Sequence, residues 1–338
     1  MHRSYKQLTR EERHVLAAYL SDSKSLRWIS TKLRRSVGGL SAEITRNSLD
    51  GTREGYHPET AQVRSGVRQH DANRRNPLKD VRVRAYVTEK LLDDWAPDEI
   101  AERLKIDFPK DPAMRVSYET IYQWVASPEG RALDLPKHLR RGKPRREKRL
   151  APSHSRGATI PHRTGIEERP SIVATRRRFG DWETDTMLGR REKGAAVSVQ
   201  RERRSGFVRL TRVADKSACE TQRAIVGTLG ELPASLRRTL TYDNGTENVL
   251  HVAVAATLGL QTYFCDPYAS WQKGGVENEI GNVRQYRPKG QSLESLTDTE
   301  LHAIEQRLNN RPRKRLGYRT PFEVFSKHLK RLGVQLRA

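Results

Sequence analysis

The sequence predicts a multi-domain protein in which two small all-helical modules precede an α/β domain with a mixed, five-stranded sheet. Three observations support this prediction. The chain has 338 residues, more than one ordinary core needs. Apolar residues recur at helical spacing in its first part, and from residue 171 strand-like and helix-like segments alternate. We therefore divide the chain into a helical module, a second helical module, a basic linker and the α/β domain, at residues 1–50, 51–136, 137–170 and 171–338.

Residues 9–47 have the pattern of three short helices, which is typical of a helix-turn-helix module. Thr9 and Glu12 form a capping box at the start of the first helix. Gly38 and Gly39 weaken the third helix, at a cost of up to about 1 kcal/mol each relative to alanine, and allow it to begin later. A small helical bundle with solvated charges is the alternative. The expected apolar faces comprise Val15, Leu16, Tyr19 and Leu20, then Leu26, Ile29 and Leu33, then Val37, Leu40 and Ile44.

A polar stretch over residues 48–80 leads to a second helical module, which begins near Val81. Pro97 stands at a first helical position, where its missing N–H costs nothing. Ser117 caps a later helix whose inward-facing residues are Ile121, Trp124 and Val125. We interpret this segment as a second helix-turn-helix module. A helical spacer between domains is the alternative.

The charge of the chain indicates a polyanionic partner. Lysine and arginine number 64 against 41 acidic residues, so the formal net charge is +23, and the pI is near 10.3. Nucleic acid is the polyanion that such a chain favours. A basic protein without catalytic activity, of the ribosomal type, is the alternative, but the carboxylates described below disfavour it.

The charge is densest in the linker, where residues 137–149 read KHLRRGKPRREKR. Gly142 and Pro144 interrupt any helix there, and we expect this segment to follow DNA phosphates, with salt-sensitive and sequence-independent affinity. In a helix-turn-helix module, the last helix enters the major groove. The candidate DNA contacts are Ser36, Ser41 and Arg46 in the first module, Ser117, Tyr118, Thr120 and Gln123 in the second, Arg140, Arg141, Arg145 and Arg146 in the linker, and Lys273 in the α/β domain.

The α/β domain begins with strands in succession. Strands are expected at residues 181–188, 195–200, 207–213, 238–242 and 261–265, and helices at residues 217–232, 249–258 and 275–286. Three successive strands, followed by alternating helices and strands, suggest a mixed sheet between layers of helices, as in ribonuclease H-like folds.

Cysteine usage and hydropathy exclude some classes of protein. Cys219 and Cys265 lack the paired spacing of a zinc site or a disulfide framework, and we interpret both as small buried residues in a reducing compartment. The N-terminus has no apolar signal core, and no run of about 18 apolar residues is present that could span a membrane. We expect a cytoplasmic protein that acts on DNA and has no membrane partner.

Carboxylates at strand ends and on a helix indicate metal-dependent phosphoryl transfer. Two divalent ions about 3.5 to 4 Å apart generate the nucleophile and stabilise the charge of the transition state. Hard ions such as Mg²⁺ take oxygen ligands. Asp185 lies in the strand-like run GDWETDTMLG, Asp243 directly follows the strand LTY, and Glu277 borders the apolar stripe of a helix.

These patterns leave alternatives open. Asp181 and Glu183 share one strand face with Asp185, because side chains alternate along a strand. Glu279 borders the same helical stripe as Glu277, on its other side. An Asp-Asn-Gly sequence by itself is commonly a plain turn.

Ordered motifs along the chain resemble those of the transposases of the bacterial insertion-sequence-thirty family. In the first half these are LTREER, WAPDEIAERLK and MRVSYETIYQWV, which resemble parts of two helix-turn-helix modules. The second half contains FGDWETDTMLG, LTYDNGTEN, YFCDPYASWQKGGVENEIGNVRQYRPKG and LNNRPRKRLGYRTPFEVF. The resemblance implies a ribonuclease H-like catalytic fold, with Asp185, Asp243 and Glu277 as the catalytic and metal-binding residues.

The resemblance also implies the reaction and its partners. The protein would be a DNA transposase that uses Mg²⁺ or Mn²⁺, two ions per active site. It would bind terminal inverted repeats through its N-terminal modules, cut and join them to target DNA, and pass through a circular intermediate. We expect a homodimer or higher homo-oligomer on double-stranded DNA, in the bacterial cytoplasm and associated with the nucleoid.

The sequence departs from the family pattern at a few positions. Ala96 stands where a capping serine is usual, Val276 where asparagine is usual, and Gly38 and Gly39 where polar residues are usual. Two other functions remain as alternatives. One is a non-catalytic helix-turn-helix regulator, and the other is a structure-selective nuclease with a ribonuclease H-like fold.

Overall fold

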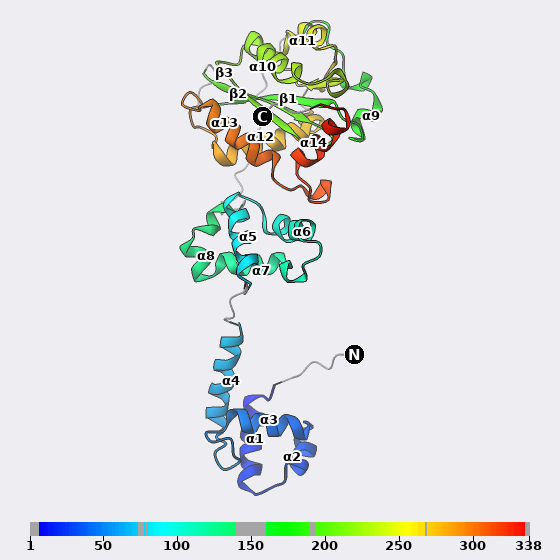
Figure 1. Ribbon diagram of the computed structural model, residues 1–338. Helices are drawn as coiled ribbons and strands as arrows, with labels where there is room; N and C mark the ends of the chain where they lie inside the picture. Colours follow the sequence, from blue (N-terminus) through cyan, green and yellow to red (C-terminus); the bar gives the residue numbers. More distant parts are fainter. Residues whose placement is uncertain are drawn as a thin grey trace. The chain divides into compact units, whose positions relative to one another are not determined.

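The computed structural model describes residues 7–73, 78, 80–139, 160–189, 194–267 and 269–334. The chain forms two compact units, residues 1–77 and residues 78–338 (Figure 1). In the described part of the chain, no helix is long and apolar enough to cross a membrane. Four predicted linker contacts, Arg140, Arg141, Arg145 and Arg146, lie outside the described residues.

The first unit confirms the three predicted helices and adds a fourth. They are α1 (Arg10–Ser21), α2 (Leu26–Leu33), α3 (Val37–Asn47) and α4 (Pro58–Asn73). Thr9 and Glu12 form the predicted capping box, and Leu16, Ile29, Leu40 and Ile44 form most of the core. The prediction that Val37 is buried is wrong, because it is the first residue of α3 and is 39% exposed, and Val15, on the predicted apolar face of α1, is 38% exposed.

Helix α3 begins ahead of both glycines, because Ser36 caps it. The Ser36 hydroxyl accepts the backbone N–H of Gly39 at 3.1 Å. A side chain at position 39 would approach that hydroxyl to 2.9 Å, so glycine suits the close approach of the cap. The capping bond offsets part of the low helix propensity of the two glycines.

Helix α4 was expected to be a polar stretch, and it packs through polar groups. The buried Arg13 donates to Glu43 at 2.6 Å, to Gln62 at 2.6 Å and to Ser65 at 3.0 Å, and Gln62 and Ser65 belong to α4. Ser65 is itself buried. A helix held in this way has little apolar periodicity, so the pattern of hydrophobic residues does not reveal it.

We predict that Arg13→Ala destabilises the first unit by about 3–5 kcal/mol, because it leaves Glu43 buried without its partner. Hydrogen–deuterium exchange of α1 and α4 in the full chain would measure this change as faster exchange. The matched control is Arg10→Ala, since Arg10 pairs with Glu59 at the surface, where both side chains are more than half exposed. Such a surface pair contributes about 0–1 kcal/mol. Equal effects of the two substitutions would contradict the prediction.

The second unit begins with the predicted second helical module. Its helices are α5 (Val81–Leu92), α6 (Pro97–Asp107), α7 (Tyr118–Ala126) and α8 (Pro128–Ala132), with short 3-10 turns η1 (Pro112–Met114) and η2 (Leu135–His138). Pro97 is the first residue of α6, as predicted. Ser117 caps α7, and Ile121, Trp124 and Val125 are buried.

The rest of the second unit is the predicted mixed sheet between helices. The strands are β1 (Asp181–Leu188), β2 (Ala196–Glu202), β3 (Val208–Val213), β4 (Thr239–Tyr242) and β5 (Gln261–Phe264), in the order β3-β2-β1-β4-β5. β1 and β3 pair antiparallel with β2, whereas β4 runs parallel to both β1 and β5. This order and these directions are those of the ribonuclease H-like fold.

Helices cover both faces of the sheet. α10 (Ala218–Gly230) and α11 (His251–Leu258) lie on one side, and α12 (Gly274–Tyr286) and α13 (Asp298–Asn309) lie on the other (Figure 1). The remaining elements are α9 (Ser171–Ala174), α14 (Pro321–Arg331), η3 (Ile166–Glu168), η4 (Ala234–Leu236), η5 (Thr246–Asn248), η6 (Ser270–Lys273) and η7 (Lys314–Leu316). The prediction that both cysteines are buried is wrong for Cys219, which lies in the first turn of α10 and faces solvent.

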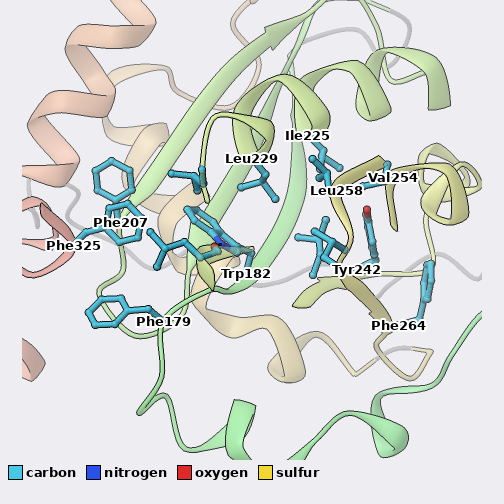
Figure 2. Close-up of a cluster of buried hydrophobic side chains, with 14 of the residues drawn as sticks. Phe179, Trp182, Phe207, Ile225, Leu229, Tyr242, Val254, Leu258, Phe264 and Phe325 are labelled. Atoms are coloured by element: carbon cyan, nitrogen blue, oxygen red, sulfur yellow. Dashed lines mark hydrogen bonds between the residues drawn. The ribbon is translucent and has the colours of Figure 1, made fainter. Parts of the chain in front are cut away.

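The two sheet faces differ in chemistry. Figure 2 shows Trp182 and Tyr242 in an apolar cluster with Ile225 and Leu229 of α10. Since side chains alternate along β1, the carboxylates on either side of Trp182 lie on the opposite face, toward α12. The face toward α12 and α13 carries these acidic residues next to a second apolar cluster, which includes Met187, Val197 and Val276.

Candidate active site

Asp185 and Asp243 meet beside the carboxyl end of β4, one of the inner strands of the sheet. β1 and β4 are parallel neighbours, with Glu183 opposite Thr241, so each aspartate lies two residues beyond this pair. Both carboxylates form ion pairs with the Lys273 ammonium, Asp185 at 3.0 Å and Asp243 at 2.9 Å. Lys273 comes from η6, ahead of α12, and is only 4% exposed. Two carboxylates therefore converge on a single cationic atom.

Burial and the ion pairs shift the pKa values of this group. Burial raises the pKa of Asp185 above its ordinary value, although Lys273 opposes the change. Burial acts in the same direction on Asp243, but there Lys273, the Gly245 N–H and Lys216 together outweigh it and the pKa falls. For Lys273, burial disfavours the charged form, yet the two aspartates raise its pKa. The lysine is thus held as a cation between the two aspartates.

Backbone and side-chain donors orient the carboxylates. Asn248 donates to Asp243 Oδ1 at 2.8 Å, and the N–H of Gly245 donates to the same oxygen at 3.4 Å. The N–H of Thr186 donates to Asp185 at 2.8 Å. Sequence reasoning missed Asn248, although its position five residues after Asp243, in the motif DNGTEN, was a signal for it.

The other acidic residues of β1 belong to buried ion pairs. Asp181 accepts from Arg178 at 2.8 Å and from the Thr239 hydroxyl at 2.8 Å. Glu183, fully buried, pairs with Arg203 and accepts the N–H of Val276 at 2.9 Å. Asp181 and Glu183 are therefore bound by arginines in ion pairs that connect parts of the fold, whereas Asp185 pairs with Lys273.

The two glutamates of α12 also differ. Glu279 is 2% exposed and accepts from Arg313 at 2.8 Å and from Asn282 at 2.9 Å. Glu277 is half-buried in the first turn of the helix. Among the described residues, no three His, Cys, Asp or Glu side chains lie close enough together to hold a metal ion. The structure thus joins Asp185 to Asp243 without bringing Glu277 into the same cluster.

The predicted DNA contacts of the helical modules lie on α3 and at the start of α7. Ser41 and Arg46 are exposed on α3, and Ser36 is its cap. Tyr118 is 56% exposed at the first residue of α7, and Gln123 is exposed on the same helix. The hydroxyls of Ser117 and Thr120 lie 2.8 Å apart and take part in the cap. Lys273, also predicted to contact DNA, lies between the two aspartates.

The chain is similar over nearly its whole length to curated transposases. It is 37% identical to the transposase for insertion sequence element IS1086 of Cupriavidus metallidurans, over 96% of each chain. Identity to the transposase for IS4351 of Bacteroides fragilis is 35%, over 95% of each chain. Identity to the transposase InsI for IS30A of Escherichia coli is 34%, over 96% of this chain and 85% of that protein.

Two other comparisons gave weaker results. No protein-family model matches the chain. Among solved structures, the catalytic core domain of BIV integrase is 21% identical, with a TM-score of 0.35, and the match covers 45% of this chain and 98% of that one.

Proposed function

This chain belongs to the IS30 family of insertion-sequence transposases and is a DNA transposase, and from this premise we propose that it cuts and joins DNA at Asp185, Asp243 and Glu277. A non-catalytic regulator and a structure-selective nuclease are not favoured. The observation that carries the proposal is the convergence of Asp185 and Asp243 on one cation. The neighbouring carboxylates Asp181 and Glu183 support it, because arginines already bind them.

The site fits divalent metal ions, which we propose to be two Mg²⁺ or Mn²⁺ ions. Asp185 and Asp243 offer carboxylate oxygens, the donors that these ions prefer, and the two side chains already share a positive charge. Bound ions would make the attacking oxygen more nucleophilic near neutral pH and stabilise the charge that develops on the phosphate. Glu277 would complete the ligand set from the first turn of α12.

The residues around the pair have separate tasks in this proposal. Asn248 and the N–H of Gly245 keep the Asp243 carboxylate turned toward Asp185. Lys273 holds the two aspartates together, and its ammonium would have to leave them if both carboxylates were to bind a divalent cation. Its ammonium would then lie beside the DNA phosphate, which is the role in DNA binding predicted for it from the sequence.

The helical modules would bring the correct DNA to this site. We propose that α3, with Ser41 and Arg46, and α7, with Tyr118 and Gln123, contact the terminal inverted repeats in the major groove. The net charge of +23 would add affinity for phosphates. Two DNA ends must be held at once, so we further propose a dimer or larger assembly, a circular DNA intermediate, and action on the bacterial nucleoid in the cytoplasm.

A strand-transfer assay tests this function. The full chain is incubated with duplexes that carry the inverted repeats flanking its gene, in Mg²⁺, in Mn²⁺ and in EDTA. We expect cleavage, joining and circular products in either metal and none in EDTA. A shift of the DNA without cleavage would indicate a regulator. Cleavage without joining would indicate a nuclease, and activity in EDTA would refute the metal assignment.

We predict that Lys273→Ala raises the affinity for Mn²⁺, measured without DNA, by about tenfold or more, because it removes a competing charge about 3 Å from both carboxylates. Calorimetric titration of the full chain measures this affinity. The apo variant should also melt earlier and gain more stability from Mn²⁺ than the wild type. Lys105→Ala is the control, since Lys105 pairs with Glu102 at 2.7 Å at the surface of α6. Unchanged or weaker Mn²⁺ binding by Lys273→Ala would contradict the prediction.

A further inference from the structure

The Trp271 indole is 76% exposed, more than any other large apolar side chain in the described part of the chain. The remaining tryptophans differ from it, because Trp95, Trp124 and Trp182 are buried and Trp28 is 40% exposed. Leaving an indole in water forgoes the favourable burial of a large apolar surface. An exposure of this size at a defined position indicates a surface that binds something.

The turn that carries Trp271 is held on both sides. The Gln272 side chain accepts the N–H of Asp266 at 2.7 Å and donates to the Asp266 carboxylate at 2.7 Å. Ala269 is 5% exposed and Lys273 is 4% exposed. The turn is therefore anchored before and after the indole, and this anchoring turns Trp271 outward. The conformation of the turn therefore determines the exposure of the indole.

The position of Trp271 relates it to the catalytic carboxylates. Only Gln272 separates it from Lys273, whose ammonium contacts both Asp185 and Asp243. In the proposed function, a DNA phosphate lies at these two aspartates during cleavage. The nucleotide that carries this phosphate would therefore lie near the indole. Aromatic side chains bind bases by stacking, and every base offers a flat face for this.

We propose that Trp271 stacks on a nucleobase beside the phosphate that is cut, after that base has left its pair. The inference rests on the proposed function of Asp185 and Asp243. A base inside a duplex has both faces covered, so it must unpair to reach a side chain. Stacking on Trp271 compensates for the lost pairing and holds the DNA strand with its phosphate at the carboxylates.

The surroundings of the indole favour a base over an apolar protein partner. A surface for protein docking usually has a contiguous apolar patch. Trp271 is instead followed by Gln272 and Lys273, and the Asp266 side chain joins the same turn. In the described part of this turn, the exposed indole stands beside the polar side chains of Gln272 and Asp266, and in a chain with a net charge of +23 such a ring suits a nucleotide.

Cleavage rates on two substrates test the proposal. One duplex carries the terminal repeat and its flank fully paired, and the other has a mismatch that unpairs the base next to the cut. We expect Trp271→Ala to cleave the paired duplex about 10- to 100-fold more slowly and to recover to within about threefold on the mismatched one. Trp271→Phe, which keeps a ring, should stay within about fivefold. Val252→Ala is the control, because Val252 is half-exposed on α11 of the same domain.

Wild-type cleavage of the paired duplex by Trp271→Ala would overturn the proposal, as would an equal loss on both duplexes. A second readout needs no cleavage and covers a variant that folds poorly. Asp243→Asn and Asp243→Asn/Trp271→Phe are titrated with DNA, and tryptophan fluorescence is followed. Stacking predicts quenching that the Trp271→Phe change removes, and equal quenching in both proteins refutes it. The same fluorescence titration is repeated with two DNA substrates. One is an uncut terminal-repeat duplex, and the other is a target duplex added to a terminal repeat that is already cut. The substrate that quenches the fluorescence is the one that supplies the base.

The outcomes separate this inference from the proposed function. If Asp243→Asn still cleaves DNA, the carboxylate assignment fails, whatever Trp271 does. If Asp243→Asn is inactive and Trp271→Ala cleaves paired DNA at the wild-type rate, only the stacking proposal fails.

Discussion

Replacing Asp243 by asparagine is expected to lower the rate of DNA cleavage by about 1,000-fold or more, with the fold and DNA binding retained. In the proposed site, the Asp243 carboxylate supplies negative charge where Lys273 now lies and where a metal ion would bind. Charge stabilisation by metal ions contributes several kcal/mol to such reactions. A loss of about 4 kcal/mol corresponds to about 1,000-fold in rate. The amide has the same shape, and Asp185 keeps its ion pair with Lys273 at 3.0 Å, so the local structure should persist.

A single-turnover cleavage assay with the full chain and a terminal-repeat duplex in Mg²⁺ measures this effect, and a gel shift checks that the DNA is still bound. Asp298→Asn is the matched control, because Asp298 is an exposed aspartate in the first turn of α13 and should leave the rate unchanged. Cleavage and joining by Asp243→Asn at the wild-type rate would remove Asp243 from the proposed site.

The elements of the sheet domain could be predicted because their patterns are local. Side chains alternate over residues 181–188, and the strand has these bounds in the structure. Helix α4 could not be predicted, because the residues that hold it, Gln62 and Ser65, are polar and contact an arginine that lies far away in the sequence. Local apolar periodicity contains no information about such long-range polar contacts.

The choice of catalytic carboxylates shows the same limit. Alternation puts Asp181, Glu183 and Asp185 on one face, and no local property of β1 separates them. The separation comes from arginines elsewhere in the chain, such as Arg203, which pairs with Glu183 across the sheet. The resemblance to a family implied Asp185 without this physical reason, and the ion pairs of Asp181 and Glu183 support that choice in the proposed function.

The place of Lys273 was also beyond sequence reasoning. Its residue type and the net charge of +23 indicated a DNA contact, which is the ordinary interpretation of an isolated basic residue in such a protein. The turn η6 instead directs it inward, where two aspartates bind it. A turn of four residues has no periodicity from which this direction could be inferred.

Glu277→Gln and Glu279→Gln are expected to have opposite effects, although the two residues are only two positions apart on α12. Glu277 is half-buried and is the third ligand in the proposed site, so its substitution should lower the cleavage rate by about 1,000-fold. Its effect on the free energy of unfolding should be at most about 1 kcal/mol, as for other partly exposed charges. Glu279, which is 2% exposed, should show the reverse.

The physical reason lies in the partners of Glu279. Its carboxylate lies 2.8 Å from Arg313 and 3.5 Å from Arg201, and Arg201 is itself buried. Neutralising Glu279 removes the counter-charge of Arg313 and leaves Arg201 with Glu183 alone, at 3.9 Å, and breaking such a buried pair costs about 3–5 kcal/mol. The folded fraction of Glu279→Gln should still cleave DNA at nearly the wild-type rate.

Two measurements on each variant decide the matter: urea unfolding of the full chain, and the single-turnover cleavage rate corrected for the folded fraction. A stable but inactive Glu277→Gln beside an unstable but active Glu279→Gln would support Glu277 as the third carboxylate. The reversed pattern would move the catalytic role to Glu279, and the ion pairs with Arg201 and Arg313 would then have to break before metal ions could bind.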